Sequence, residues 1–478
     1  MSNAKNLLDA LYEEGVIPTY SFPKNVVSTY ISDANGKVQY QVDRGLDVAI
    51  GEYAPGRGIV VDKQTYQIGG MYYPGSERKK GAASSPARAY VEDPNYVKHL
   101  LRCPECGWFG LENENDGTCP FCGHEGLEVA KDMLRPWGFA PRDGKSIPYA
   151  QLEEEYTAVG QPLYSTLPNS DDIEEIQGCK NVRMASRTNQ RIIMLNAGSG
   201  QKGFMVCPDC GAAMPGDDPD VLKKVMRPYR SKFVKMRCTH PDPINVDLGY
   251  DFITDMLVLE ISLDKNEVDV DRCGFWLHQA AQSFAEALRL AACKKLDVEF
   301  TELVTGYRFR QNKQGAFIDV YLYDSLSSGA GYAVSVKESI SELFDDMREL
   351  LGGCNCGSAC YNCLKHYRNQ YIHGSLNRFY ALELLDWALY GKVAEPLDIE
   401  AQQKLLKPLA GMLKESGCDV AFTLDSIKIS ADGMEKEVIV YPGMWNKQIS
   451  DKILYLSDIY LKFAKPYGVE QILRSLNL

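Results

Sequence analysis

The clustering of cysteines constrains this chain more than any other feature of its sequence. The chain has 15 cysteines, and most of them fall into three tight groups. The groups are Cys103, Cys106, Cys119 and Cys122; Cys207, Cys210 and Cys238; and Cys354, Cys356, Cys360 and Cys363. In small secreted domains held by disulfides, the cysteines are spread along the sequence. Paired Cys-x-x-Cys spacing in a long chain instead indicates thiolate ligands of a metal. We therefore expect the chain to fold around bound metal ions.

The first group combines two turns of the form Cys-Pro-x-Cys-Gly in one short segment. Each turn presents two sulfur atoms, and its glycine relieves the backbone. Two such turns complete a tetrahedral shell with Zn–S distances of about 2.3 Å. The pattern predicts a structural zinc ribbon, and the alternatives are redox thiols or cysteines of an ordinary core. His124 follows the second turn, but four sulfur atoms already complete the shell.

The last group has the spacing Cys-x-Cys-x3-Cys-x2-Cys. Four thiols in so short a stretch would repel one another as thiolates unless a cation drew them together. We therefore expect Cys354, Cys356, Cys360 and Cys363 to hold a metal. Zinc and an iron–sulfur cluster both accept four cysteine ligands, and the residue types alone do not separate them.

The middle group contains one good turn, Cys207-Pro-Asp-Cys210-Gly. Its partner would be Cys238 with His240, which would give a zinc shell of three cysteines and one histidine. The alternative is a ribbon that folds without metal. The remaining cysteines are expected to be buried as small hydrophobic residues, and these are Cys179, Cys273, Cys293 and Cys418.

Length and composition predict a multidomain globular protein, because 478 residues exceed what one core holds. No run of about 18 apolar residues occurs, and acidic residues stand near the start, where a signal peptide would carry basic ones. We therefore expect a cytoplasmic protein without a membrane partner. The net charge of −12 and the pI near 5.2 exclude a chain that coats nucleic acid by bulk electrostatics. Any contact with nucleic acid must use a local patch.

The pattern of elements predicts a mixed fold, α+β to α/β, in five parts. The predicted parts are a β-rich module (1–95), a zinc ribbon (96–147), a β-leaning region with the second cysteine turn (148–248), an α/β core with a four-cysteine zinc knot (249–395) and a small C-terminal α/β domain (396–478). The four-cysteine knot is expected between two helices, over 335–351 and 378–391.

Periodicity predicts several elements within these parts. Residues 256–263 and 317–324 read as strands, and the apolar spacing from Ala281 to Ala291 predicts a long helix between them. A short amphipathic helix is expected at Leu7 to Leu11. In the C-terminal domain, the turn around Asp432 and Gly433 predicts a hairpin.

No catalytic motif is visible in the sequence. A phosphate-binding loop ends in Gly-Lys-Ser or Gly-Lys-Thr, because backbone amides and the lysine cradle the phosphates. The nearest string, NAGSGQKGF at 196–204, lacks that ending. An HExxH helix and a Gly-x-Ser-x-Gly turn are also missing. We predict no catalytic residues, and the alternative is a metal-dependent nuclease in which acids such as Asp319 and Asp324 converge in the fold.

Two stretches combine cations with aromatic rings. Cations that pair with phosphates beside rings that stack on bases are typical of surfaces that bind single-stranded nucleic acid. The alternatives are a solvated basic face and a docking surface for an acidic protein. The candidate nucleic-acid-binding residues are Lys223, Lys224, Arg227, Tyr229, Arg230, Lys232, Phe233, Lys235 and Arg237 in the first stretch, and Lys365, Tyr367 and Arg368 in the second.

The string GGCNCGSACYNCLKHYRNQYIHGSLNRFYALELLDW, over 352–387, resembles the MrfA-like zinc-binding domain, which lies at the carboxyl end of superfamily 2 DNA helicases. The segments YDFITDMLVLEI and YDSLSSGAGYA resemble other parts of the same region. The segment VIPTYSFPKNVVSTYI is similar to the part that follows the second motor domain in those helicases. The resemblance implies zinc at the Cys354 group and work on DNA.

The resemblance also implies a partner. Those helicases carry an ATP-driven motor, and no motor motif is visible here. We therefore expect an accessory protein that associates with a superfamily 2 helicase and contacts DNA, or a fragment of a longer chain. Free-standing relatives are similar to DISARM DrmB, so phage defence and DNA repair are the implied settings. A protein-only scaffold is the alternative from another functional class.

Overall fold

The computed structural model describes most of the chain. The described residues are 26–33, 37–72, 87–112, 117–142, 145–154, 157, 159–160, 163–164, 173–225, 237–238, 240–271, 273–312, 315–326, 329–446 and 448–476. The helix expected at Leu7 to Leu11 lies outside them. The chain groups into two compact units. Unit 1 comprises Met1–Pro168, Thr188–Asp255 and Leu326–Ala330, and unit 2 comprises Asn169–Arg187, Met256–Ser325 and Gly331–Leu478. The finer division into five parts stays a prediction.

Unit 1 contains a five-stranded sheet. Its strands follow the order β2 (Val38–Gly45), β1 (Val26–Ser32), β10 (Phe139–Pro141), β4 (Gln64–Met71) and β3 (Gly58–Val61). Helix α2 (Leu46–Glu52) follows β2 directly and buries Leu46, Ala49 and Ile50 in one core with Ile68 of β4. The β-rich character predicted for the N-terminal part is confirmed.

Two small hairpins carry cysteine turns. Strand β6 (Leu100–Arg102) pairs with β7 (Phe109–Leu111) and with β8 (Glu128–Val129). Strand β14 (Phe204–Val206) pairs with β15 (Ala213–Pro215). In each hairpin the first strand leads directly into a Cys-x-x-Cys turn, and the second strand begins just after it. The strands therefore fix the ends of the turns that present the sulfur atoms.

A ten-stranded sheet contains the long strands β13 (Val182–Asn196) and β16 (Ile244–Leu263). Strand β16 pairs antiparallel with β18 (Gly315–Asp324), which pairs with β17 (Leu303–Asn312). The sheet also includes β14 and β15 and four short strands, β5 (Val97–Lys98), β9 (Asp132–Leu134), β11 (Leu163–Tyr164) and β12 (Glu174–Glu175). The strands predicted over 256–263 and 317–324 are therefore present.

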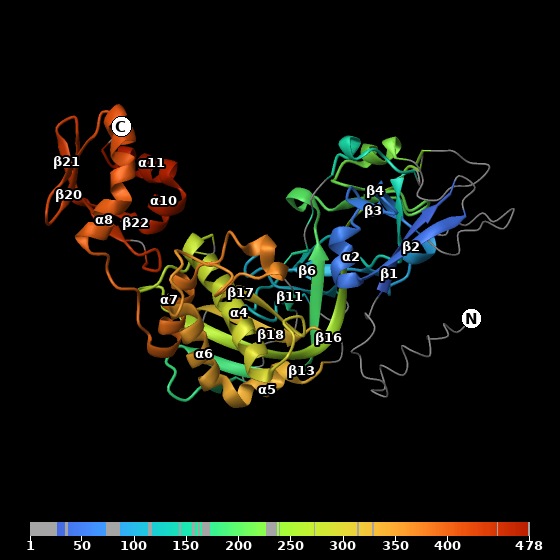
Figure 1. The fold of residues 1–478 in the computed structure, drawn as a ribbon, viewed down its shortest axis with the longest axis horizontal. Helices are drawn as coiled ribbons and strands as arrows, with labels where there is room; N and C mark the ends of the chain where they lie inside the picture. The colour runs from blue at the N-terminus through green and yellow to red at the C-terminus, as the bar shows by residue number, and fades with distance from the viewer. Residues whose placement is uncertain are drawn as a thin grey trace. The chain divides into compact units, whose positions relative to one another are not determined.

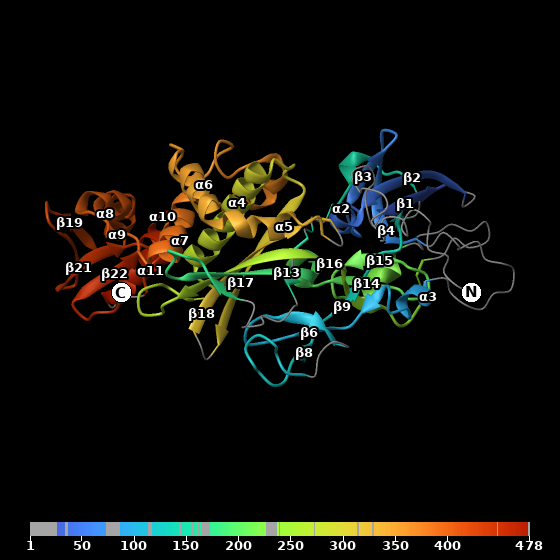
Figure 2. The same ribbon diagram turned by 90° about the horizontal axis from the view of Figure 1, so that it is seen from below.

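Three helices cover one face of the β17 and β18 part of this sheet (Figures 1 and 2). Helix α4 (Phe275–Leu296) packs against α6 (Ile340–Gly352), α7 (Arg378–Tyr390) and the two strands. The short helix α5 (Tyr332–Ser335) precedes α6. Helix α4 is buried more widely than its predicted apolar stripe, because the polar side chains of Gln282 and Glu286 are buried as well.

The C-terminal part of unit 2 has its own small sheet and core. Strands β19 (Asp419–Phe422), β20 (Ile427–Ala431), β21 (Met434–Tyr441) and β22 (Ile453–Ser457) lie in that order, beside helices α8 (Ile399–Leu406), α9 (Ala410–Glu415), α10 (Asp458–Phe463) and α11 (Lys465–Ser475). The predicted hairpin joins β20 and β21. Asp432 and Gly433 have φ angles of 49° and 80°, which is typical of a two-residue type I′ turn.

These elements confirm the predicted mixed fold of helices and sheets. Among the described helices, none combines the length and the apolar character that a membrane crossing requires.

Candidate metal centres

The structure brings each cysteine group into a compact cluster, in which all four donor atoms lie within 4.8 Å of one another. The clusters are Cys103, Cys106, Cys119 and Cys122; Cys207, Cys210, Cys238 and His240; and Cys354, Cys356, Cys360 and Cys363. Tetrahedral zinc would place its sulfur ligands about 3.8 Å apart. The Sγ–Sγ distances are 3.5 Å between Cys106 and Cys119 and 3.7 Å between Cys356 and Cys363. The donor sets therefore fit Zn²⁺.

The three Cys-x-x-Cys-Gly turns share one backbone pattern. In each turn the N–H of the glycine donates to the carbonyl oxygen of the first cysteine at 2.9 Å. Gly107, Gly123 and Gly211 have φ angles of 70°, 73° and 76°, a left-handed conformation that glycine adopts without steric cost. The role expected for these glycines is therefore confirmed. In the middle cluster, Nδ1 of His240 lies 3.3 Å from Sγ of Cys207, so the imidazole faces the thiols.

The cluster at Cys354 is built differently. We call the loop from Gly353 to Asn377, which runs from the end of α6 to the start of α7, the knot. The side chain of Arg378, the first residue of α7, donates to the carbonyl oxygen of Leu351 at 2.9 Å and to that of Cys356 at 3.1 Å. Arg378 is buried. It ties both ends of the knot together, although nothing in the local sequence marked it as functional.

The thiols themselves indicate the need for a cation. Burial raises the pKa of Cys122 to about 11 and the pKa of Cys363 to about 12. The Cys106 thiol donates a hydrogen bond to Cys119, and this bond raises the pKa of Cys106 further than burial does, while it lowers the pKa of Cys119 to about 5. Without a metal, Cys106, Cys122 and Cys363 would stay protonated at neutral pH. Zinc stabilises the thiolate form, so metal binding releases their protons and couples each cluster to folding.

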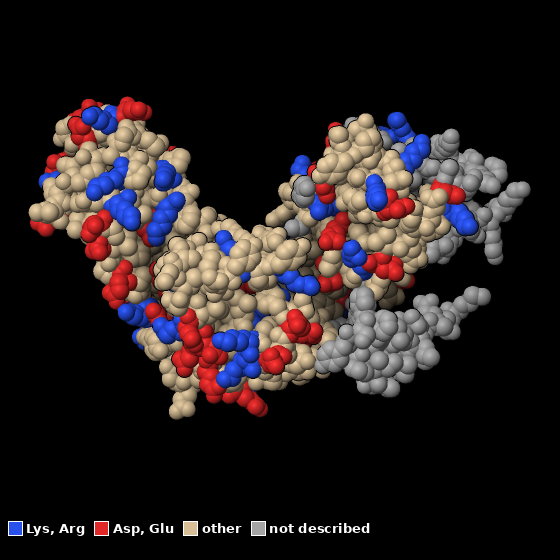
Figure 3. Space-filling model, in the orientation of Figure 1, with Lys and Arg blue, Asp and Glu red and all other residues tan. Residues whose placement is uncertain are grey.

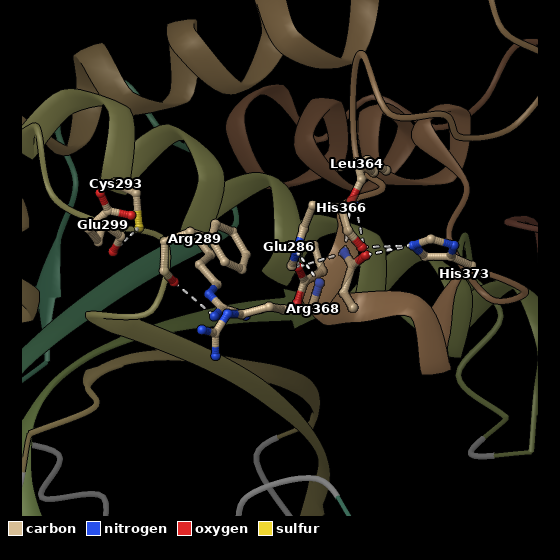
Figure 4. Close-up of polar contacts among 10 residues, drawn as sticks. Glu286, Arg289, Cys293, Glu299, Leu364, His366, Arg368 and His373 are labelled. Atoms are coloured by element: carbon tan, nitrogen blue, oxygen red, sulfur yellow. Dashed lines mark hydrogen bonds and ion pairs between the residues drawn. The ribbon is translucent and has the colours of Figure 1, made fainter. Parts of the chain in front are cut away.

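A buried polar network joins the knot to α4 (Figure 4). Asn369, in the 3-10 helix η9 (Tyr367–Ile372), donates through Nδ2 to Glu286 of α4 at 3.1 Å and to the carbonyl oxygen of Leu364 at 2.8 Å. Its Oδ1 accepts the backbone N–H of His366 at 2.9 Å, and Nε2 of His373 lies at the same distance. Every polar group of the Asn369 amide therefore has a partner, which fixes η9 on α4.

His366 completes this network. Its Nδ1 accepts the backbone N–H of Arg368 at 3.1 Å, which places the ring proton on Nε2, facing Glu286 at 3.3 Å. The ring also lies against Phe300, with the ring centroids 3.8 Å apart. Sequence reasoning missed Glu286 and Asn369 as positioning residues, because they are 83 positions apart in the chain.

The surface around the knot exposes aromatic rings. Tyr361, Tyr367 and Tyr371 are 67%, 82% and 75% exposed, and Arg368 is exposed between the last two. Lys365 is half-buried. The second candidate stretch for nucleic acid therefore lies on the surface, on a backbone that the knot and the Asn369 network hold in place. We call Tyr361, Tyr367, Arg368 and Tyr371 the tyrosine surface.

The first candidate stretch is described only at its ends. Lys223 is exposed and pairs with Asp220 at 2.6 Å, and Arg237 is exposed. The side chain of Lys224 is not among the described parts of the chain. The remaining candidates also lie outside the described residues, and they are Arg227, Tyr229, Arg230, Lys232, Phe233 and Lys235.

The two acids named for a nuclease have structural partners. Burial would raise the pKa of Asp319, but the guanidinium groups of Arg308 and Arg310 hold it below its ordinary value. They lie 3.0 Å and 3.2 Å from the carboxylate. Asp324 accepts the backbone N–H groups of Tyr332 and Ala333 at 3.2 Å and 2.8 Å. Both carboxylates thus stabilise the fold, and among the described residues only the cysteine clusters have metal-binding spacing.

The isolated cysteines follow the prediction only in part. Cys293 and Cys418 are buried, and Cys179 is partly buried. The expectation was wrong for Cys273, which is exposed. It lies in a turn just before α4, where its backbone N–H donates to the side chain of Asp271 at 2.9 Å.

Comparison with known proteins agrees with this geometry. Residues 284–364 match the family model of the MrfA Zn-binding domain, and this segment contains all four cysteines of the knot and Glu286. Because the matched family is a zinc-binding one, the match favours zinc over an iron–sulfur cluster as the metal of the knot. The expected Zn²⁺ cofactor is confirmed.

The chain is also similar to proteins of known identity. It is 30% identical over 465 residues to Druantia protein DruE of Escherichia coli (strain UMEA 4076-1). This alignment covers 92% of this chain and 25% of that protein. The chain thus spans a quarter of the length of that relative. Two crystal structures of the DUF1998 helicase MrfA, bound to DNA and bound to DNA with AMPPNP, match 80% of the chain with TM-scores of 0.37 and 0.29, at 13% and 10% identity. The two matched regions cover 38% and 36% of the respective MrfA chains.

Proposed function

Because this chain contains an MrfA Zn-binding domain, we propose that it is the zinc-binding, DNA-contacting part of a helicase system. In this proposal the chain is an accessory subunit that works with a superfamily 2 motor ATPase. The sequence resemblance to helicase-associated regions and the similarity to Druantia protein DruE support it. Phage defence or DNA repair is the proposed setting.

The tyrosine surface carries this proposal. Three tyrosines exposed by 67% or more lie within one short segment together with Arg368. Exposed rings next to a cation suit single-stranded DNA, because each base that stacks on an aromatic ring contributes about 1–3 kcal/mol. The knot and the Asn369 network fix the backbone that bears these rings, so little conformational freedom is lost on binding. Lys223 and its neighbours in the first stretch are proposed as additional phosphate contacts.

The proposed role of zinc is structural. In each cluster the protein supplies all four ligands, so no position remains for a water molecule or a substrate. The proposed ligands are Cys103, Cys106, Cys119 and Cys122; Cys207, Cys210, Cys238 and His240; and Cys354, Cys356, Cys360 and Cys363. In the knot, the ion would order a loop that joins two helices and bears the tyrosine surface.

A single-stranded oligonucleotide and a salt titration test the DNA contact. We expect the double variant Tyr367→Ala with Tyr371→Ala to weaken binding at least tenfold, because two stacking contacts are lost. Tyr149→Ala is the matched control, because Tyr149 is 78% exposed but lies outside the knot. Binding should also weaken steeply as salt rises, because phosphate contacts release counterions. Equal affinity of the double variant and the control would contradict the proposal.

A separate experiment tests the partner. We expect the purified chain to co-elute with the superfamily 2 helicase encoded nearest to it, and the complex to persist when Tyr367 and Tyr371 are replaced. A protein-only scaffold predicts helicase binding without any affinity for DNA. A chain that binds neither DNA nor the helicase would overturn the proposal as a whole.

A further inference from the structure

A cavity of about 840 Å³ lies in unit 2 beside α7, and the function proposed above does not use it. Its walls come from α7 and the adjoining residues Gly357, Ser358 and Asn377 of the knot, from the segment 392–397, and from α8 and α10. Leu382, Leu405 and Leu461 and the partly exposed rings of Phe379 and Phe463 form apolar walls, and charged side chains also line it. Sites for small organic molecules have this size and combine apolar walls with a small number of polar groups.

Two polar groups at this cavity lie on successive turns of α7. Tyr380 is 3% exposed, and its hydroxyl has no hydrogen-bond partner among the described residues. A buried hydroxyl without a partner is destabilising, so such an atom calls for an explanation, of which a ligand is one. Glu383 accepts the indole N–H of Trp276 at 2.6 Å. Burial raises the pKa of Glu383 to about 7, so it can donate or accept a hydrogen bond near neutral pH.

The other acids that line the cavity are already paired. Asp386 lies 2.6 Å from Arg348, Glu395 lies 2.9 Å from Lys392, and Asp458 lies 2.5 Å from Lys462. Two further lysines of the lining are exposed, Lys404 of α8 and Lys465 at the start of α11. Neither has an acidic partner within the part of the chain that the structure describes.

The cavity therefore offers unpaired positive charge next to an apolar interior. On the face shown in Figure 3, the α8 to α11 part of unit 2 carries Lys and Arg side chains as well as Asp and Glu side chains. An anionic group fits the lysines, an aromatic ring fits the leucine and phenylalanine walls, and a hydrogen-bonding edge fits Tyr380 and Glu383. A nucleotide combines these three features in one molecule of suitable size.

We propose that this cavity binds a nucleotide, with the base between the apolar walls and the phosphate on Lys404 and Lys465. Tyr380 and Glu383 then hydrogen-bond to the edge of the base. The nucleotide is either free or the phosphorylated end of a DNA strand. The inference does not depend on the tyrosine surface, which lies on other residues.

Isothermal titration calorimetry of the full chain with 2′-deoxyadenosine 5′-monophosphate tests this proposal. We expect saturable binding, weaker by about tenfold or more in Lys404→Gln with Lys465→Gln, and by about fivefold in Tyr380→Phe, which removes only the hydroxyl. Lys414→Gln is the control, because this exposed lysine of α9 lies outside the cavity. Unchanged melting temperatures show that each variant is folded.

Further titrations separate the two sources of the ligand. If a 5′-phosphorylated oligonucleotide displaces the mononucleotide and the same oligonucleotide without its phosphate does not, the natural ligand is a strand end. Binding of the mononucleotide alone would identify a free nucleotide. The proposal is overturned if neither probe binds at millimolar concentration, if deoxyadenosine binds as tightly as its monophosphate, or if the cavity variants bind like Lys414→Gln.

Discussion

The zinc ribbon at Cys103 and the knot at Cys354 offer four sulfur atoms each, yet they are built in opposite ways. In the ribbon, two similar turns with Gly107 and Gly123 present the sulfur atoms, the first between the paired strands β6 and β7 and the second inside the bridge between Thr118 and Glu125. In the knot, the loop depends on Arg378 and on Asn369, whose contacts reach α6 and α4. The ribbon is a local module, whereas the knot is part of the core of unit 2. Loss of metal should therefore have local effects in the first and wide effects in the second.

The largest expected effect comes from removing one ligand of the knot. Cys360→Ser should release its zinc, loosen α6 and α7, and lower the free energy of unfolding by about 4 kcal/mol or more. Cys119→Ser should also release one zinc but leave the tyrosine surface able to bind DNA. Zinc content, thermal unfolding and oligonucleotide affinity measure the difference. Equal loss of DNA affinity in both variants would break the comparison.

The next effect concerns pH. Burial raises the pKa of Glu383, in the helix that follows the knot, to about 7. The unfolded chain loses this proton near its ordinary pKa of about 4.5, while the folded chain keeps it. The free energy of unfolding should therefore fall as the pH rises from about 4.5 to about 7, by about 3 kcal/mol in total. Glu383→Gln should remove this part of the pH dependence in denaturant unfolding, and identical profiles would contradict the assignment.

A smaller effect is expected from the network that holds η9. Asn369→Ala should cost about 2 kcal/mol, because it removes one hydrogen bond to the buried carboxylate of Glu286 and leaves the backbone N–H of His366 without the acceptor Oδ1. Affinity for single-stranded DNA should fall as well, while the zinc content stays unchanged. Asn362→Ala is the matched control, because Asn362 is an exposed asparagine of the same knot. If both variants unfolded at the same temperature, the stability of the knot would not depend on its contacts with α4, and the proposed difference from the ribbon would be wrong.

The smallest effect is expected at a cysteine outside the clusters. Cys293 is buried in α4, and Cys293→Ser should cost only about 1 kcal/mol and leave every zinc in place. Thermal unfolding and metal analysis check this. Destabilisation as large as that of Cys360→Ser would mean that the unfolding assay reports loss of buried thiols rather than loss of metal.

The sequence alone predicted those features of the fold and of the metal sites that are determined by residues close together in the chain. The cysteine turns, the helices on either side of the knot and the hairpin at Asp432 and Gly433 all follow from short-range spacing and backbone preference. The network of Glu286 with Asn369 could not be predicted, because a glutamate on a helix usually faces water and its partner is far away in the chain. The cavity beside Tyr380 was missed for the same reason, since its walls come from separate helices.

Metal analysis of the pure protein tests the central claim most directly. Three clusters of four donors predict three zinc ions per chain, two of which remain in Cys360→Ser. A preparation that contains iron and sulfide, or no transition metal at all, would contradict the account.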